Sequence, residues 1–240
     1  MYRLLFVICA ALSLFALAPA RVQAGEPVLI ELFTSQGCSS CPPADRLLRE
    51  LGAREDVIAL AYHVDYWDYL GWEDAFGQRA FSKRQHSYSQ RVNREYIGGR
   101  YRGAFTPELV IAGSDSLVGS ARKIIEKRIA AHSRAPTPAT ISLRRDGGAI
   151  RVEIASRGKP APRVRVMLAT YVPSATVRIS RGENAGKTID YSNIVTDLRK
   201  IGEWDGTAPV TVAARDVEGP AVIFLQRGEA GRIIACAQID

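Results

Sequence analysis

The spacing of hydrophobic positions changes near residue 135, and this change separates two kinds of predicted structure. Before it, residues 28–33 and 57–62 are short continuous apolar runs, which are typical of strands buried on both faces of a parallel sheet. Between them, apolar side chains recur at helical spacing and form one stripe, made of Ala44, Leu47, Leu48 and Leu51. The first half of the chain therefore begins with a strand, a helix and a strand.

The rest of the first half adds a helical insertion and two more strands. The elements expected are a helical insertion at 73–93, a break at Gly98 and Gly99, a strand from Pro107 to Ile111, a returning strand at 117–119 and a helix at 121–132. This order predicts an α/β domain over residues 25–134.

A linker with two prolines, residues 135–138, is followed by hydrophobic positions that alternate with a period of two. Short strands are expected at 141–143, 150–154, 164–168, 175–180, 187–195, 209–214, 221–226 and 232–239. Many short strands separated by turn residues favour a β-sandwich, with Trp204 packed in its interior. We therefore predict an all-β, sandwich-like domain over residues 139–240.

The first 24 residues have the pattern of a secretory signal peptide. A charged start at Arg3 precedes an apolar run, and Val22, Gln23 and Ala24 provide a small-residue cleavage site. The apolar run is too short to span a bilayer well, and no later run reaches that length. We expect cleavage near Ala24 and a periplasmic or secreted protein without stable membrane insertion.

The charge of the chain argues against a nucleic-acid partner. The formal net charge is +7 at pH 7, and two of the basic residues, Arg3 and Arg21, belong to the expected signal peptide. The other basic residues are scattered, as on a solvated surface. We expect no nucleic-acid binding, and only loose attraction to an anionic cell envelope.

Cys38 and Cys41 form a C-x-x-C pair between the first strand and the first helix. Pro42 and Pro43 fit a helix start, because the first amides of a helix have no partner inside it. The partial positive charge of a helix start stabilises a thiolate. In a redox-active pair, Cys38 is expected to be the more exposed, attacking sulfur, and Cys41 the resolving sulfur.

Two other interpretations of this pair stay open. A zinc site needs further ligands, but Cys236 is the only other cysteine after the signal peptide, and no second C-x-x-C occurs. A structural disulfide that closes the short loop needs no further residue. Cys236 itself lies in a run that is apolar on both faces, and we expect a buried, unreactive thiol. We predict no metal and no cofactor.

Other residues are placed to line the same site. His63, Asp65 and Trp67 follow the second strand directly, at the end of the sheet where open α/β sheets bind ligands. Thr106 precedes Pro107 at the start of the next strand. A cis bond there would turn the backbone of Thr106 toward the dithiol, where it can pair with an extended peptide. The alternative is that the aromatic residues only cover the inserted helix.

The segments ELFTSQGCSSCPPAD at 31–45 and HVDYWD at 63–68 resemble a family of secreted bacterial proteins catalogued as a domain of unknown function. More broadly, residues 27–132 look like a thioredoxin fold. The family resemblance implies fold and export. In thioredoxin-like proteins a buried acid in the first strand takes protons from the resolving cysteine, and Glu31 resembles that acid. Alternatively, Glu31 pairs with a cation.

The leading hypothesis is an exported thiol-disulfide oxidoreductase. Its substrate would be a protein or a small molecule that carries a thiol or a disulfide, and a redox partner that the sequence does not identify would regenerate it. One alternative is a binding module whose disulfide is structural. Another is a copper carrier with His63 as a third ligand, because soft thiolates suit Cu(I).

Overall fold

A computed structural model describes residues 26–92 and 103–240. The predicted signal peptide and the glycine pair at 98–99 lie outside these residues. The described helices are α1 (Pro42–Gly52), the short 3₁₀ helix η1 (Asp68–Leu70), α2 (Arg79–Ser89) and α3 (Arg122–Ser133). The strands are β1 (Val28–Thr34), β2 (Val57–His63), β3 (Glu108–Ile111), β4 (Asp115–Val118), β5 (Ala139–Asp146), β6 (Ala149–Ser156), β7 (Val164–Arg178), β8 (Thr188–Trp204), β9 (Val210–Ala214), β10 (Ala221–Gln226) and β11 (Ile233–Ile239). None of the described helices is long and apolar enough to cross a membrane.

One large mixed sheet contains eight strands in the order β11-β10-β7-β8-β2-β1-β3-β4. β1 is parallel to β2, whereas β3 is antiparallel to β1 and β4 is antiparallel to β3. The last residues of the two parallel strands, Thr34 and His63, lie opposite each other. The prediction of a mixed α/β first half is confirmed, and the residues that follow β1 and β2 start from the same end of the sheet.

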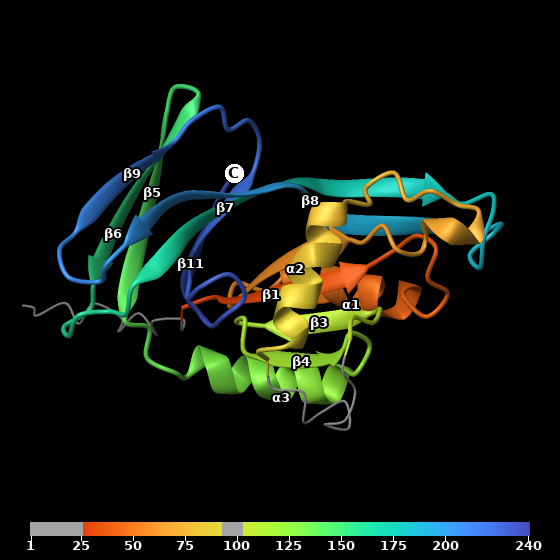
Figure 1. Cartoon of the computed structure of the whole chain (residues 1–240), viewed down its shortest axis with the longest axis horizontal. Coiled ribbons are helices and arrows are strands. Elements are labelled where there is room, and N and C mark those ends of the chain that lie inside the picture. Colours follow the sequence, from red (N-terminus) through yellow and green to blue (C-terminus); the bar gives the residue numbers. More distant parts are fainter. Residues whose placement is uncertain (1–25, 93–102) are drawn as a thin grey trace, which may run out of the picture.

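A long hairpin formed by β7 and β8 connects the two halves of the chain. β8 pairs in parallel with β2, where Ile194 lies opposite Ala61. In Figure 1 the hairpin runs across the molecule, from the region of β5 and β6 to the opposite end. The large sheet is therefore continuous across the predicted linker at 135–138, and the division into two domains stays a prediction.

β7 is one strand where the sequence predicted two, at 164–168 and 175–180. Pro173 lies between the two predicted strands, and proline cannot donate to a ladder. β10 pairs with β7 only as far as Thr170. Beyond that point β7 has β8 on one side only, so a proline is tolerated there without loss of a ladder bond.

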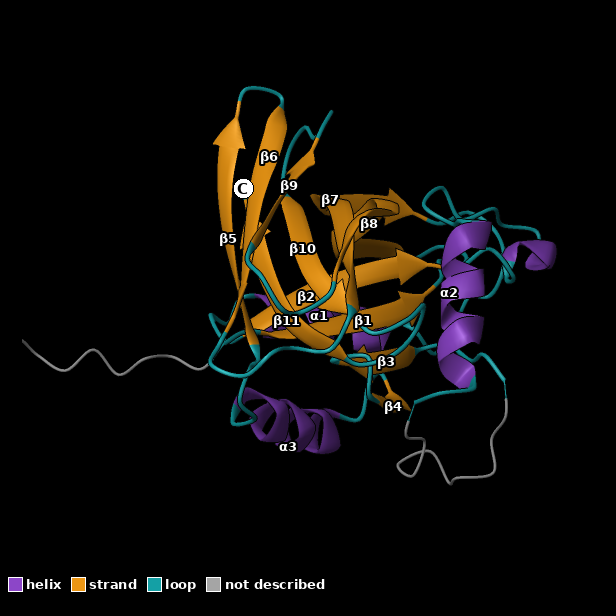
Figure 2. Ribbon diagram, turned by 60° about the vertical axis from the view of Figure 1, so that its left-hand side comes forward, coloured by secondary structure: helices purple, strands orange, loops and turns teal. Residues whose placement is uncertain are grey.

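A second sheet of three strands, in the order β5-β6-β9, packs over part of the large sheet (Figure 2). Apolar side chains from both sheets share one cluster, which includes Val152 of β6, Val166 of β7 and Ile223 of β10. Trp204 is 2% exposed in this cluster, and its indole nitrogen donates to the Ala208 carbonyl at 2.7 Å. The predicted interior position of Trp204 is confirmed.

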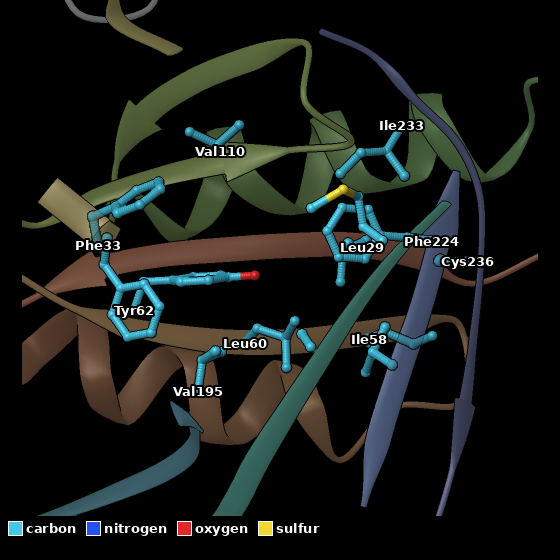
Figure 3. Packing of buried hydrophobic residues seen from close by; sticks show 14 of the residues in the cluster. Leu29, Phe33, Ile58, Leu60, Tyr62, Val110, Val195, Phe224, Ile233 and Cys236 are labelled. Atoms are coloured by element: carbon cyan, nitrogen blue, oxygen red, sulfur yellow. The ribbon is translucent and has the colours of Figure 1, made fainter. Parts of the chain in front are cut away.

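The part of the large sheet around β1 is covered on both faces. α1 and α3 cover one face, where Leu48 and Ile125 pack against Ile30. On the other face, side chains of α2, β10 and β11 share one cluster with Leu29 and Tyr62. Figure 3 shows the β10 and β11 side chains Phe224, Ile233 and Cys236 of this cluster. Strands buried on both faces read as continuous apolar runs, which is why the pattern of β1 and β2 predicted their position well.

The predicted insertion at 73–93 is helical only from Arg79. Before it, one carboxylate oxygen of Asp74 accepts the amide of Phe76 at 2.9 Å, and the Asp74 carbonyl accepts the amide of Gly77 at 2.8 Å. A short polar side chain that bonds the nearby backbone competes with helix formation. The turn at Asp74 therefore delays the start of α2.

Candidate dithiol site

The C-x-x-C pair forms a disulfide between Cys38 and Cys41, with Cα atoms 5.4 Å apart. Cys41 is the N-cap of α1 and has helical backbone angles, and Pro42 is the first helical residue. The Cys41 carbonyl accepts hydrogen bonds from the amides of Ala44 and Asp45 at 2.8 and 3.1 Å. The pair therefore lies at a helix N-terminus, as the sequence predicted.

The expected exposure of Cys38 is wrong. Both cysteines are 0% exposed, whereas Ser39 and Ser40 between them are exposed. The Ser40 hydroxyl lies 3.4 Å from the Cys38 sulfur. A reagent that reaches the disulfide must therefore first displace part of this loop.

The residues before β3 lie against the dithiol loop. The Ser40 hydroxyl donates to the Thr106 carbonyl at 3.5 Å, and the indole N–H of Trp67 donates to the Thr106 hydroxyl at 2.8 Å. The peptide bond between Thr106 and Pro107 is cis, as expected. Trp67 also approaches Gly37, because a Cβ built on Gly37 would lie 3.1 Å from the Trp67 Cβ. Of the predicted site residues, Thr106 and Trp67 thus lie against the dithiol loop, and Pro107 follows Thr106 through the cis bond.

The loop between β7 and β8 contributes two residues that the sequence analysis missed. The buried Asn184 side chain donates to the carbonyls of Gln36 and Cys38 at 2.9 and 2.8 Å. A carboxylate oxygen of Glu183 accepts the amide of Ser39 at 3.1 Å. Both residues belong to the segment at 182–186. Its role in the structure is to fasten the backbone of the dithiol loop from the opposite half of the chain.

His63 and Asp74 form a buried pair behind the dithiol loop. The His63 Nδ1 and an Asp74 carboxylate oxygen are 2.7 Å apart, and both side chains are 0% exposed. The same carboxylate oxygen accepts the amide of Gln36 at 2.7 Å. His63 therefore reaches the dithiol loop through Asp74, which sequence reasoning did not single out.

Asp45, in the first turn of α1, is a second buried acid at this end of the sheet. One of its carboxylate oxygens accepts the Thr34 hydroxyl at 2.8 Å. Burial raises the pKa of Asp45 to about 7, although the nearby His63 and the bond from Thr34 lower it. Asp45 thus titrates close to neutral pH, which is a property shared by many groups that transfer protons.

Glu31 and Asp65 have partners outside the dithiol loop. Glu31 is 0% exposed and forms an ion pair with Arg84 of α2 at 2.8 Å. It also accepts the Tyr88 hydroxyl at 2.5 Å. Asp65 accepts the Ser82 hydroxyl of α2 at 2.5 Å. The pairing of Glu31 with a cation is the alternative that the sequence left open.

Comparison with known proteins adds a crystal structure of similar length. Protein AGR_C_4864 from Agrobacterium tumefaciens has 30% sequence identity and a TM-score of 0.76, over 90% of this chain and 95% of its own. HBP35 of Porphyromonas gingivalis has 14% identity and a TM-score of 0.51, over 90% of this chain and 75% of its own, and shares the fold only. The search of curated proteins found no match.

The fold and the site define a mixed α/β protein with a C-x-x-C disulfide between a strand and a helix. Residues 29–226 match the family described as "Protein of unknown function (DUF1223)". The chain belongs to this family, which agrees with the resemblance seen in the sequence.

Proposed function

We propose that this protein is an exported thiol-disulfide oxidoreductase with a thioredoxin-like core. The observation that carries the proposal is the position of the Cys38–Cys41 disulfide, which joins the loop after β1 to the N-cap of α1. The strand order β2-β1-β3-β4, with one parallel and two antiparallel pairs, supports the thioredoxin-like assignment. The apolar leader at 1–24 supports export.

The reaction moves two electrons between dithiol and disulfide. The Cys38 thiolate attacks a substrate disulfide, one substrate sulfur leaves as a thiolate, and a mixed disulfide forms. Cys41 then attacks the Cys38 sulfur, which releases the second substrate sulfur and forms the Cys38–Cys41 disulfide. The substrate is thereby reduced. An external dithiol, supplied by a redox partner, reduces the protein again, and the opposite direction follows the same steps in reverse.

Thr106 provides the surface on which an extended substrate would lie. Its carbonyl is within reach of the Ser40 hydroxyl and its hydroxyl is held by Trp67. Backbone groups at the start of a strand can pair with an added extended peptide. We therefore assign Thr106 and Pro107 to substrate binding and Trp67 to the orientation of Thr106.

Trapping in the exporting cell tests this proposal. Cys41→Ser leaves an attacking thiolate with no resolving sulfur, so mixed disulfides with substrates should accumulate. The matched control is the variant that carries both Cys38→Ser and Cys41→Ser. Trapped species at the level of the double variant would contradict thiol exchange.

A binding module with a structural disulfide is the second candidate. The observation that favours it is the complete burial of both cysteines. The copper carrier has less support. His63 is engaged by Asp74, and among residues 26–92 and 103–240 no group of three His, Cys, Asp or Glu residues is placed to hold a metal ion.

A further inference from the structure

We propose that Asp45 is the proton acceptor for Cys41 when Cys41 resolves a mixed disulfide, and that the nearby His63 and Asp74 tune its charge. This inference rests on the proposed thiol exchange and extends it. Glu31 had been expected in the accepting role, but its carboxylate is engaged by Arg84 and Tyr88.

Asp45 is placed on the same side of α1 as Cys41. The two residues are four positions apart, and the Asp45 amide donates to the Cys41 carbonyl at 3.1 Å. Helical side chains four positions apart lie on one face, and each leans over the turn that precedes it. Helix geometry therefore places the Asp45 side chain over the turn that holds Cys41, and one carboxylate oxygen is held by the Thr34 hydroxyl at the end of β1. Both residues are buried, at 3% and 0% exposure.

Three buried polar atoms near Asp45 have no hydrogen-bond partner within the described residues. They are Asp45 Oδ2, His63 Nε2 and the Tyr191 hydroxyl. The rings of His63 and Tyr191 pack edge to face with centroids 4.8 Å apart. Buried polar atoms are rarely left unpaired in folded proteins, and a group of them indicates a site for exchangeable protons or water. The structure thus holds a buried polar site around Asp45 that the Thr34 hydroxyl satisfies only in part.

Each element around Asp45 contributes a group that acts on its charge. Burial makes ionisation of Asp45 costly, and the negative charge of Asp74 adds to that cost. His63, the Thr34 hydroxyl and Arg46 favour ionisation. The raised pKa of Tyr191 arises from burial and from the charges of Asp45 and Asp74. His63 therefore helps the Asp45 carboxylate to ionise in an apolar environment, and Asp74 opposes it.

The proton balance of the resolving step is as follows. The Cys41 thiol transfers its proton to the Asp45 carboxylate while its sulfur attacks the Cys38 sulfur. The bond between Cys38 and the substrate sulfur breaks, and the substrate leaves as a thiolate, which takes a proton from water. When the Cys38–Cys41 disulfide is reduced again, Asp45 returns its proton to Cys41.

Two-phase thiol kinetics test the assignment. The mature protein with Cys236→Ala is reduced and mixed with an aromatic disulfide reagent whose released thiolate is coloured. Attack by Cys38 releases one coloured thiolate, and resolution by Cys41 releases a second. Asp45→Asn should slow the second phase about a hundredfold near neutral pH and leave the first unchanged. Asp56→Asn removes an exposed carboxylate that pairs with Arg54 and is the matched control.

The pH profile separates a proton acceptor from a structural residue. The second phase of the protein with Asp45 should rise with a midpoint of about 7. Asp45→Asn should shift that midpoint to the range of an unassisted thiol, about 8.5 or higher. Thr34→Val removes the hydrogen bond that favours the ionised Asp45 carboxylate, so it should raise the pH midpoint of the second phase while Asp45 is still present. This variant serves as the test if Asp45→Asn does not fold.

The outcomes distinguish the two proposals. If the parent protein shows no second phase, the thiol-exchange function itself is contradicted. If it shows both phases, but Asp45→Asn or Thr34→Val leaves the rate and midpoint of the second phase unchanged, only the role of Asp45 is overturned. A loss of the first phase in folded Asp45→Asn also overturns it, because the assigned role concerns Cys41 alone.

Discussion

The Arg84 guanidinium and the Glu31 carboxylate form an ion pair at 2.8 Å in the interior of the protein, with side chains 6% and 0% exposed. The guanidinium also lies over the rings of Tyr62, Tyr88 and Phe224. It therefore connects α2 to β1, β2 and β10 at one point of the core.

Removal of one partner of this pair should be strongly destabilising. Arg84→Met leaves Glu31 buried without its cation, and the free energy of unfolding should fall by about 3–5 kcal/mol. Adding Glu31→Gln should recover part of the loss. Urea denaturation measures both variants, with the exposed Arg151–Glu153 pair as control, where Arg151→Met should cost less than about 1 kcal/mol. If Arg84→Met and Arg151→Met lowered the free energy of unfolding equally, the expected large contribution of the buried Arg84–Glu31 pair would be contradicted.

Asp45 should make folding less favourable as the pH rises. Its pKa in the folded protein, about 7, is above the ordinary carboxyl value of 3.8. The folded state then binds more protons than the unfolded state between these values, so the free energy of unfolding falls with pH across this window and levels off above it. Asp45→Asn should reduce this fall in the free energy of unfolding. Compared with the parent protein, the variant should therefore gain stability above pH 7 relative to its stability below pH 4. Denaturation midpoints across the pH range test this, and parallel curves for both proteins would refute it.

The bonds from Asn184 should stabilise the dithiol loop. Asn184→Ala removes the donor to the carbonyls of Gln36 and Cys38, and the Cys38 carbonyl keeps only its bond from the Cys41 amide, so a loss of about 1–3 kcal/mol is expected. The disulfide should also be reduced faster by a small dithiol, because the loop opens more readily. Lys187→Met is the comparison variant, because it removes the Nζ donor to the Asn184 side-chain oxygen but leaves both bonds from Asn184 to the dithiol loop, so it should change the reduction rate less. A reduction rate equal to that of the parent protein would exclude this role for Asn184.

Cys236 should react slowly with thiol reagents in the native protein. Burial raises the pKa of its thiol to about 12, and the nearby Glu26 adds to this effect. Its sulfur lies 3.1 Å from the Pro27 carbonyl. Labelling followed by mass spectrometry should find Cys236 modified only after denaturation. Rapid labelling in the folded state would show that β11 leaves the core easily.

The redox potential of the Cys38–Cys41 pair decides between exchange and structure. We expect a value above about −300 mV, measured by equilibration with dithiol buffers of known potential. A lower value would place the pair among structural disulfides and favour the binding module.

The sequence predicted the elements whose signal is local. The spacing of Leu47, Leu48 and Leu51 predicted the buried face of α1, and the continuous run at 28–33 predicted β1. The C-x-x-C pair and the start of α1 could be recognised from the short segment that contains Cys38, Cys41, Pro42 and Pro43. In these cases the pattern itself decides the structure, because burial of one face is what the pattern encodes.

The remainder of the site depends on contacts between distant residues. Asn184 and Cys38 are 146 positions apart, and no local pattern connects them. Asp45 lies in the first turn of α1, where an exposed acid is common because it stabilises the helix N-terminus. Its position in the sequence therefore gave no reason to expect its burial. Asp74 lay inside a segment predicted as helix. A buried polar residue is defined by its partners, so these residues were identified only when β1, β2 and the β7–β8 loop were seen together.

The pairing of β8 with β2 has a consequence for the design of fragments. A recombinant piece that ends at residue 134 would retain both cysteines and α1, and would look like a minimal redox domain. It would also lack β8, so β2 would become an open edge with unpaired backbone groups, a known starting point for aggregation. The dithiol loop would lose its anchor at Asn184 in the same truncation. Activity measured on such a fragment would describe a different molecule, and assays of this protein are best made on a chain that includes both β2 and β8.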